Sequence, residues 1–192
     1  EKMNTAPPGA FPKTTTGSPT IITESSDGER ITLRFSGSGD VNYQAMTGTQ
    51  WANNVSPGNI GMAGIVMNVV QLTGGSVIDV NMVFSSLGGR IRFSATNIVY
   101  GFGFAGAVTV TGSPDDGDYH EYRIESTDGV NAKYYRDDVL VATVVMGTIS
   151  NNNRIQFDFN ADPGETTEVV IEEAFYASTS RPFLVGPNYR LF

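Results

Sequence analysis

Residues 117–143 constrain the fold more than any other part of this 192-residue chain. In the first part of the segment, Tyr122 and Ile124 alternate with charged residues. Successive side chains of a β-strand point to opposite faces of its sheet, so this period of two is typical of a strand with one dry face and one wet face. An Asp-Gly pair at 128–129 and an Asp-Asp pair at 137–138 suit tight turns. The segment therefore predicts three antiparallel strands joined by short turns.

The same alternation recurs elsewhere in the chain, where Val80 and Met82 alternate with Asp79 and Asn81. Residues 36–59 lack any sustained period and are rich in glycine, which indicates a long irregular loop. Many short strands without helical periodicity between them predict two packed antiparallel sheets. Further strands are expected at 21–23, 30–35, 63–72, 77–85, 90–94, 98–104, 105–111, 154–159 and 167–177, with glycine-pair turns at 74–75 and 88–89.

Charge and composition exclude several classes of function. The net charge of −8 argues against nucleic acid as a partner, because phosphate binding needs clustered Lys and Arg that this chain lacks. The absence of cysteine excludes disulfides and thiolate metal sites. The most apolar stretch, residues 60–72, is interrupted by Gly, Asn and Gln, so no membrane partner is expected.

A family resemblance follows from the pattern D-G-x-Y-H-x-Y-x-I, then D-G, then Y-Y-R-D-D-V-L-V-A within residues 116–142. This pattern resembles the late strands of laminin-G and concanavalin A-like jelly rolls, and residues 168–178 resemble their closing strand. The resemblance implies an all-β, two-sheet antiparallel jelly-roll sandwich with extended N- and C-terminal arms. It concerns the fold far more than the function.

Composition divides the chain into three parts. Residues 1–20 are rich in Pro and Thr and predict an extended arm, residues 21–178 form the sandwich, and residues 179–192 form an apolar C-terminal arm. The first arm is either a loose leader or a docking segment, and the second docks either on its own domain or on a neighbouring subunit. The apolar residues expected to mediate assembly are Phe11, Phe183, Leu184, Tyr189 and Phe192.

Catalytic motifs are missing. Glu172 and Glu173 are adjacent on a strand and point to opposite faces, which prevents them from acting as a pair. The E-x-D-x-E type signature of jelly-roll glucanases and the R-x-E-L-R, Q-I-H and Y-x-K-A-G-x-Y-x-Q signatures of alginate-lyase-like proteins are absent. The single histidine, His120, is interpreted as structural. The sequence therefore predicts that the chain is not an enzyme.

Binding sites are indicated by polar residues on the wet faces of predicted strands. Asp79, Asn81, Arg92, Glu121, Arg123, Gln156 and Asp158 could line one sheet and bind a sugar, although any solvent-facing sheet carries such residues. Asp115, Asp116 and Asp118 form the densest cluster of oxygen ligands and could hold Ca²⁺, but a solvated turn is the better interpretation. The residues predicted to bind a ligand are Trp51, Asn53, Arg92, Arg123, Gln156 and Asp158, with packing of Trp51 in the core edge as the alternative.

The hypothesis that joins these features is a structural or assembly protein of a virion or extracellular particle, such as a phage decoration, fibre or tail subunit. Its partners would be copies of itself, other particle proteins and a surface glycan. A secreted carbohydrate-binding module is the alternative, followed by a polysaccharide lyase or glycoside hydrolase.

Overall fold

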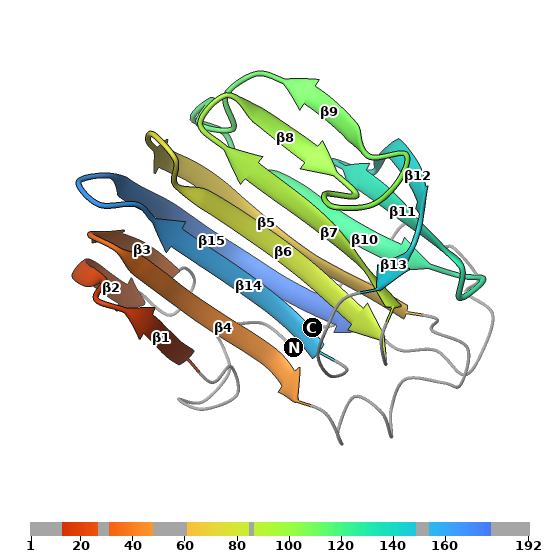
Figure 1. The fold of residues 1–192 in the computed structure, drawn as a ribbon, viewed down its shortest axis with the longest axis horizontal. Coiled ribbons are helices and arrows are strands. Elements are labelled where there is room, and N and C mark those ends of the chain that lie inside the picture. Colours follow the sequence, from red (N-terminus) through yellow and green to blue (C-terminus); the bar gives the residue numbers. More distant parts are fainter. Residues whose placement is uncertain (1–12, 27–30, 48–60, 85–86, 149–153, 178–192) are drawn as a thin grey trace.

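The computed structural model describes residues 13–26, 31–47, 61–84, 87–148 and 154–177. These residues form two antiparallel sheets stacked face to face, which confirms the predicted all-β sandwich (Figure 1). In the view of Figure 1, the sheet that we call sheet A lies in front of the second sheet, sheet B. The described part of the chain contains no helix that could span a membrane.

Sheet A and sheet B each run across the full width of the sandwich. Sheet A has the order β1 (Lys13–Gly17), β4 (Gly39–Thr47), β14 (Arg154–Ala161), β6 (Val77–Phe84), β7 (Leu87–Ser94), β8 (Asn97–Tyr100) and β9 (Val108–Thr111), and β13 (Gly147–Thr148) also pairs with β7. Sheet B has the order β12 (Val139–Val145), β11 (Asn131–Arg136), β10 (His120–Ser126), β5 (Gly61–Leu72), β15 (Thr166–Ala177), β3 (Ile31–Ser36) and β2 (Thr20–Ser26).

The core lies between the sheets and is built from the apolar half of each alternating strand. Ile78 and Val80 of β6 are fully buried, as is Ile65 of β5. Phe93 of sheet A meets Tyr122 of sheet B edge to face, with 4.6 Å between ring centroids. Because the apolar side chains point inward, the polar residues at alternate positions of β6, β7 and β14 occupy the outer face of sheet A.

The predicted three-strand meander is present as β10, β11 and β12. Its second turn holds Asp137 and Asp138 at φ angles of 51° and 63°, and Gly129 in the first turn has a φ of 72°. The local turn chemistry was therefore sufficient to predict this part of the fold.

Two local expectations need correction. Strand β4 lies inside the expected irregular loop 36–59, where it pairs with β1, formed by residues 13–17 of the predicted arm. Gly88 and Gly89 belong to strand β7 instead of a turn. A Cβ on Gly89 would lie 2.8 Å from Cγ2 of Ile124 in the opposite sheet, so this glycine permits close approach of the two layers.

Candidate functional site: a polar network on sheet A

The strand register brings polar residues of β14, β6 and β7 into two rows on the outer face of sheet A. Asp158 is opposite Asp79, which is opposite Arg92, and Gln156 is opposite Asn81, which is opposite Arg90. Directly opposite side chains on neighbouring strands have Cβ atoms only about 5 Å apart. We call this set of six residues the sheet A network: Asp79, Asn81, Arg90, Arg92, Gln156 and Asp158.

In the first row, Arg92 donates two hydrogen bonds to the carboxylate of Asp79. Its Nε donates to Oδ1 of Asp79 at 2.7 Å and its Nη2 donates to Oδ2 at 2.5 Å. This hydrogen bonding, with the nearby charge of Asp158, outweighs burial and raises the pKa of Arg92 above its ordinary value. Asp79 is only 7% exposed, so the pair fixes a charged group at the centre of the face.

In the second row, Asn81 joins the two sides of the network. It donates from Nδ2 to Oδ2 of Asp158 at 2.7 Å and accepts at Oδ1 from Nε of Arg90 at 2.6 Å. Gln156 donates from Nε2 to Oδ1 of Asp158. Each side chain is therefore oriented by a neighbour, which produces a rigid array of donors and acceptors.

One atom of this array lacks a partner. Oε1 of Gln156 is buried and accepts no hydrogen bond from the residues that the structure describes, and Gln156 as a whole is only 8% exposed. Leaving a buried acceptor unsatisfied costs about 1–3 kcal/mol. A hydrogen-bond donor from a ligand would remove this cost.

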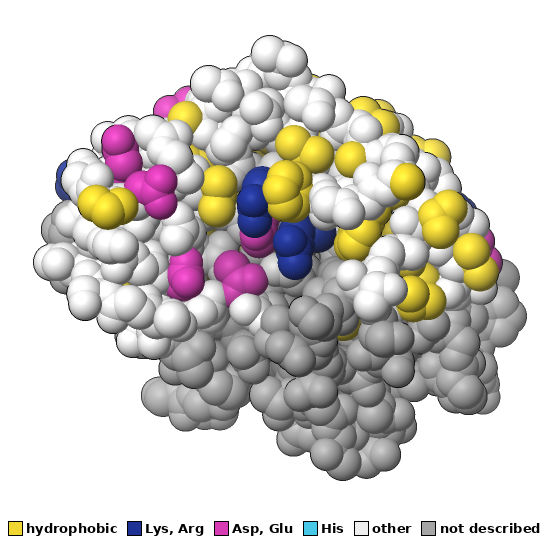
Figure 2. Space-filling model, viewed as in Figure 1, with side chains coloured by type: hydrophobic (Ala, Val, Ile, Leu, Met, Phe, Trp, Pro, Cys, Tyr) yellow, Lys and Arg dark blue, Asp and Glu magenta, His cyan; other side chains and the backbone are white. Residues whose placement is uncertain are grey.

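An aromatic ring completes the site. The guanidinium carbon of Arg92 lies 3.8 Å from the ring centroid of Phe102, which follows strand β8. Figure 2, drawn in the same view as Figure 1, shows basic and acidic side chains gathered in a hollow of this face, with hydrophobic side chains beside them. The site thus combines charge, amides and an apolar ring, the combination that small-molecule sites use.

The structure brings together only some of the predicted ligand residues. Arg92, Gln156 and Asp158 lie in the sheet A network with Asp79 and Asn81. Arg123 does not join them, because it lies on sheet B, where it contacts Glu121 and Tyr135. The expectation that these residues line one sheet is therefore corrected. Arg90 and Phe102 were missed, since neither has a distinctive local pattern.

The other predicted residues lie outside the part of the chain that the structure describes. They are Trp51 and Asn53 of the ligand set, and Phe11, Phe183, Leu184, Tyr189 and Phe192 of the assembly set.

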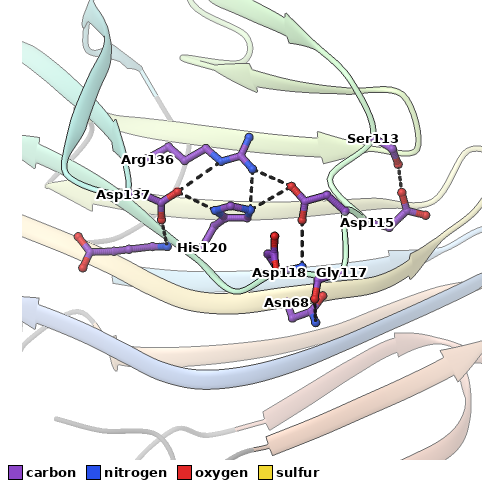
Figure 3. A network of polar contacts seen from close by, with 10 residues as sticks. Asn68, Ser113, Asp115, Gly117, Asp118, His120, Arg136 and Asp137 are labelled. Atoms are coloured by element: carbon purple, nitrogen blue, oxygen red, sulfur yellow. Dashed lines mark hydrogen bonds and ion pairs between the residues drawn. The ribbon is translucent and has the colours of Figure 1, made fainter.

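A second polar cluster surrounds His120 at the start of β10 (Figure 3). Its Nδ1 is 2.6 Å from Oδ2 of Asp137 and its Nε2 is 3.0 Å from Oδ2 of Asp116. Nη2 of Arg136 donates to the same Asp116 oxygen at 2.9 Å. The ring thus connects the loop before β10 to the turn after β11, an arrangement that orders the backbone at this end of the sandwich.

The three acidic residues considered for Ca²⁺ point to different partners (Figure 3). Asp115 accepts from Oγ of Ser113, Asp116 binds His120 and Arg136, and Asp118 donates its N–H to Asp116. Burial alone would raise the pKa of Asp116, but the hydrogen bonds from the N–H of Asp118 and from His120 and the charge of Arg136 outweigh burial and lower it. Within the described residues, no group of three such side chains could hold a metal ion.

Known proteins resemble this chain in structure and not in sequence. No family model matches it, and no curated protein matches it. A native glycosidic hydrolase has a TM-score of 0.62 at 13% identity, over 95% of this chain and 96% of the other. A prokaryotic β-1,3-1,4-glucanase (lichenase) derived from a mouse hindgut metagenome has a TM-score of 0.62 at 10% identity, over 92% and 97%. An alginate lyase of polysaccharide lyase family 7 has a TM-score of 0.58 at 12% identity, over 82% of each chain.

These likenesses overturn one prediction and weaken another. The prediction that the chain is not an enzyme is contradicted, because the similar structures are mostly enzymes and the fold is one that enzymes use. The virion role finds no support among them, whereas the alternative of sugar binding does. At these identities the likeness concerns the fold alone: the chain has the concanavalin A-like jelly-roll architecture of glycosidases, lyases and binding domains.

Proposed function

We propose that this chain binds a polysaccharide or other glycan on the outer face of sheet A. The observation that carries the proposal is the buried, unpartnered Oε1 of Gln156 within a network that is otherwise held rigid by its own hydrogen bonds. Such an acceptor needs a donor, and a sugar hydroxyl donates one hydrogen bond while accepting others.

The surrounding residues suit a hydroxyl-rich ligand. Arg90 places a guanidinium beside Asn81 in the same row, so a ligand that donates to Gln156 through one hydroxyl can accept from this cation through another. The positive charges of two arginines balance the negative charges of two aspartates, so the network carries no net charge. A neutral network favours a ligand with many hydroxyls over a highly charged one. The fold shared with glycan-processing proteins supports the proposal by analogy.

The test is a glycan array followed by calorimetric titration of each hit against wild type and Gln156→Leu. We expect Gln156→Leu to weaken binding about tenfold, because the hydroxyl loses its buried acceptor. The matched control is Gln71→Leu on β5 of sheet B, which should bind as wild type does. Equal affinities for wild type and Gln156→Leu, or no binding by wild type, would contradict the proposal.

A second candidate is hydrolysis of the bound glycan, favoured by the pairing of two carboxylates on neighbouring strands. Asp79 and Asp158 are directly opposite in the register. Glycoside hydrolysis uses two carboxyl groups that flank the scissile bond, one of which supplies a proton to the leaving oxygen. Asp79 is bound by the cation Arg92, whereas Asp158 is bound by side-chain amides. The two carboxyl groups therefore have different environments, as is required when one acts as an acid and the other does not.

Release of reducing ends from a panel of polysaccharides tests the hydrolase candidate. Asp158→Asn should abolish release. If wild type binds a glycan but releases no product from it, the hydrolase candidate fails and the binding proposal stands.

A further inference from the structure

We propose that Phe102 is the platform on which one sugar ring of the bound glycan stacks, and that the loop 101–107 is built to hold this ring at the end of the sheet A network. The inference rests on the proposed function and names a binding residue outside the polar network.

The loop is attached to the network through the backbone of Arg90. The N–H groups of Gly101 and Phe102 both donate to the carbonyl oxygen of Arg90, at 2.8 and 3.2 Å. The N–H of Phe104 then donates to the carbonyl oxygen of Gly101 at 3.0 Å, which closes a tight turn. Gly101 has a φ of 78°, a conformation that side chains other than glycine rarely adopt. The position of Phe102 is therefore fixed relative to β7.

The loop is also held from the core side. Phe104 packs against the hydrophobic core and lies over Gly147 of β13, where an added Cβ would lie 2.0 Å from Cδ1 of the ring. An added Cβ on Gly101 would lie 2.9 Å from Cγ2 of Val144. Phe104 thus anchors the loop to the core. The tight contacts of Phe104 with Gly147 and of Gly101 with Val144 prevent the loop from moving closer to the core.

The ring of Phe102 is directed to the outer face by Arg92. The guanidinium carbon lies 3.8 Å from the ring centroid, and the same guanidinium is held by both oxygens of Asp79. A cation over an aromatic face is attractive, so the ion pair fixes the orientation of the ring. Phe102 remains half-buried, so part of its surface is open to solvent beside the network.

A ring in this position complements the polar network. Sugars have polar edges of hydroxyl groups and less polar faces of C–H groups. The network supplies hydrogen bonds to the edges, and an aromatic ring supplies a flat apolar surface for a face. If the ring served only to pack against Arg92, its removal would lower stability and leave glycan affinity unchanged. A measurement of glycan affinity therefore distinguishes a packing role from a sugar-stacking role.

The experiment is calorimetric titration of the array hit against wild type, Phe102→Leu and Phe102→Trp, with thermal unfolding as a check of folding. We expect Phe102→Leu to weaken binding about tenfold and Phe102→Trp to retain it, because the second variant keeps an aromatic face. The matched control is Tyr135→Leu, which removes a ring 4.5 Å from the guanidinium carbon of Arg123 on sheet B and should not change affinity.

A second variant tests the role of the loop without touching the ligand. Gly147→Ala forces Phe104 to move and should weaken binding through Phe102, whereas its effect should vanish in the Phe102→Leu background. Wild-type affinity in Phe102→Leu would overturn the platform while leaving glycan binding intact. Failure of wild type to bind any glycan would instead defeat the proposed function, and the platform with it.

Discussion

At the scale of single residues, the ion pair between Asp79 and Arg92 is the most consequential contact of the site. Its carboxylate is almost fully buried, whereas the arginine side chain is 28% exposed. Removing one partner of such a pair leaves a buried charge without compensation, which costs more than the pair itself contributes.

We expect Arg92→Met to lower the free energy of unfolding by about 2 kcal/mol. Adding Asp79→Asn should restore part of this loss, because the amide no longer carries a buried charge. Urea denaturation measures both effects. The control is Arg34→Met on sheet B, whose side chain is 43% exposed and lies 3.4 Å from Glu168, and it should cost less than about 1 kcal/mol. Equal losses for the two arginine variants would contradict the argument.

At the scale of elements, the turn between β10 and β11 shows how a short sequence fixes a hairpin. Asp128 accepts from the N–H groups of Val130 and Asn131 at 2.8 and 2.7 Å. The hydrogen bond from the Asn131 backbone is the main reason that the pKa of Asp128 lies below its ordinary value. The folded state therefore binds this proton less tightly than the unfolded chain does.

It follows that the charge of Asp128 stabilises the fold above the ordinary carboxyl pKa of about 4, and that this contribution is lost as the pH falls through the lower, folded value. Melting temperatures between acidic and neutral pH should show a shallower acid decline for Asp128→Asn than for wild type. Parallel declines would show that the turn contributes nothing to acid sensitivity.

The sequence predicted β10 to β12 because their turns are specified by adjacent residues. It failed at β4 and at Gly89, where the structure is decided by distant partners. Strand β4 pairs with β14, more than a hundred positions later, and supplies no turn signal of its own. Gly89 meets Ile124 and Tyr134 across the sandwich, and a glycine pair in a sequence does not distinguish a turn from a close approach.

Gly89→Ala should therefore destabilise the protein by about 2 kcal/mol through overpacking. The new Cβ would meet Cγ2 of Ile124 at 2.8 Å and the hydroxyl of Tyr134 at 2.9 Å. A glycine in a turn would tolerate alanine unless its φ were positive. An unchanged unfolding midpoint in denaturant would contradict the close approach of the sheets at this position.

At the scale of the whole molecule, the sequence indicated which residues are polar and outward-facing but not which of them meet. Arg92 and Arg123 occupy equivalent wet positions of alternating strands, and only the sheet order separates them onto opposite faces of the sandwich. That order depends on long-range pairing, which periodicity does not encode. The absence of known catalytic motifs, in turn, suggested a protein without activity, although the fold is one that enzymes use.

The central claim is that glycan binds to the outer face of sheet A, and backbone amide chemical shifts recorded during titration with the array hit test it directly. The account predicts shift changes concentrated in β6, β7, β14 and the loop 101–107, with β10, β11 and β12 unaffected. Changes confined to sheet B, or none at saturating glycan, would contradict it.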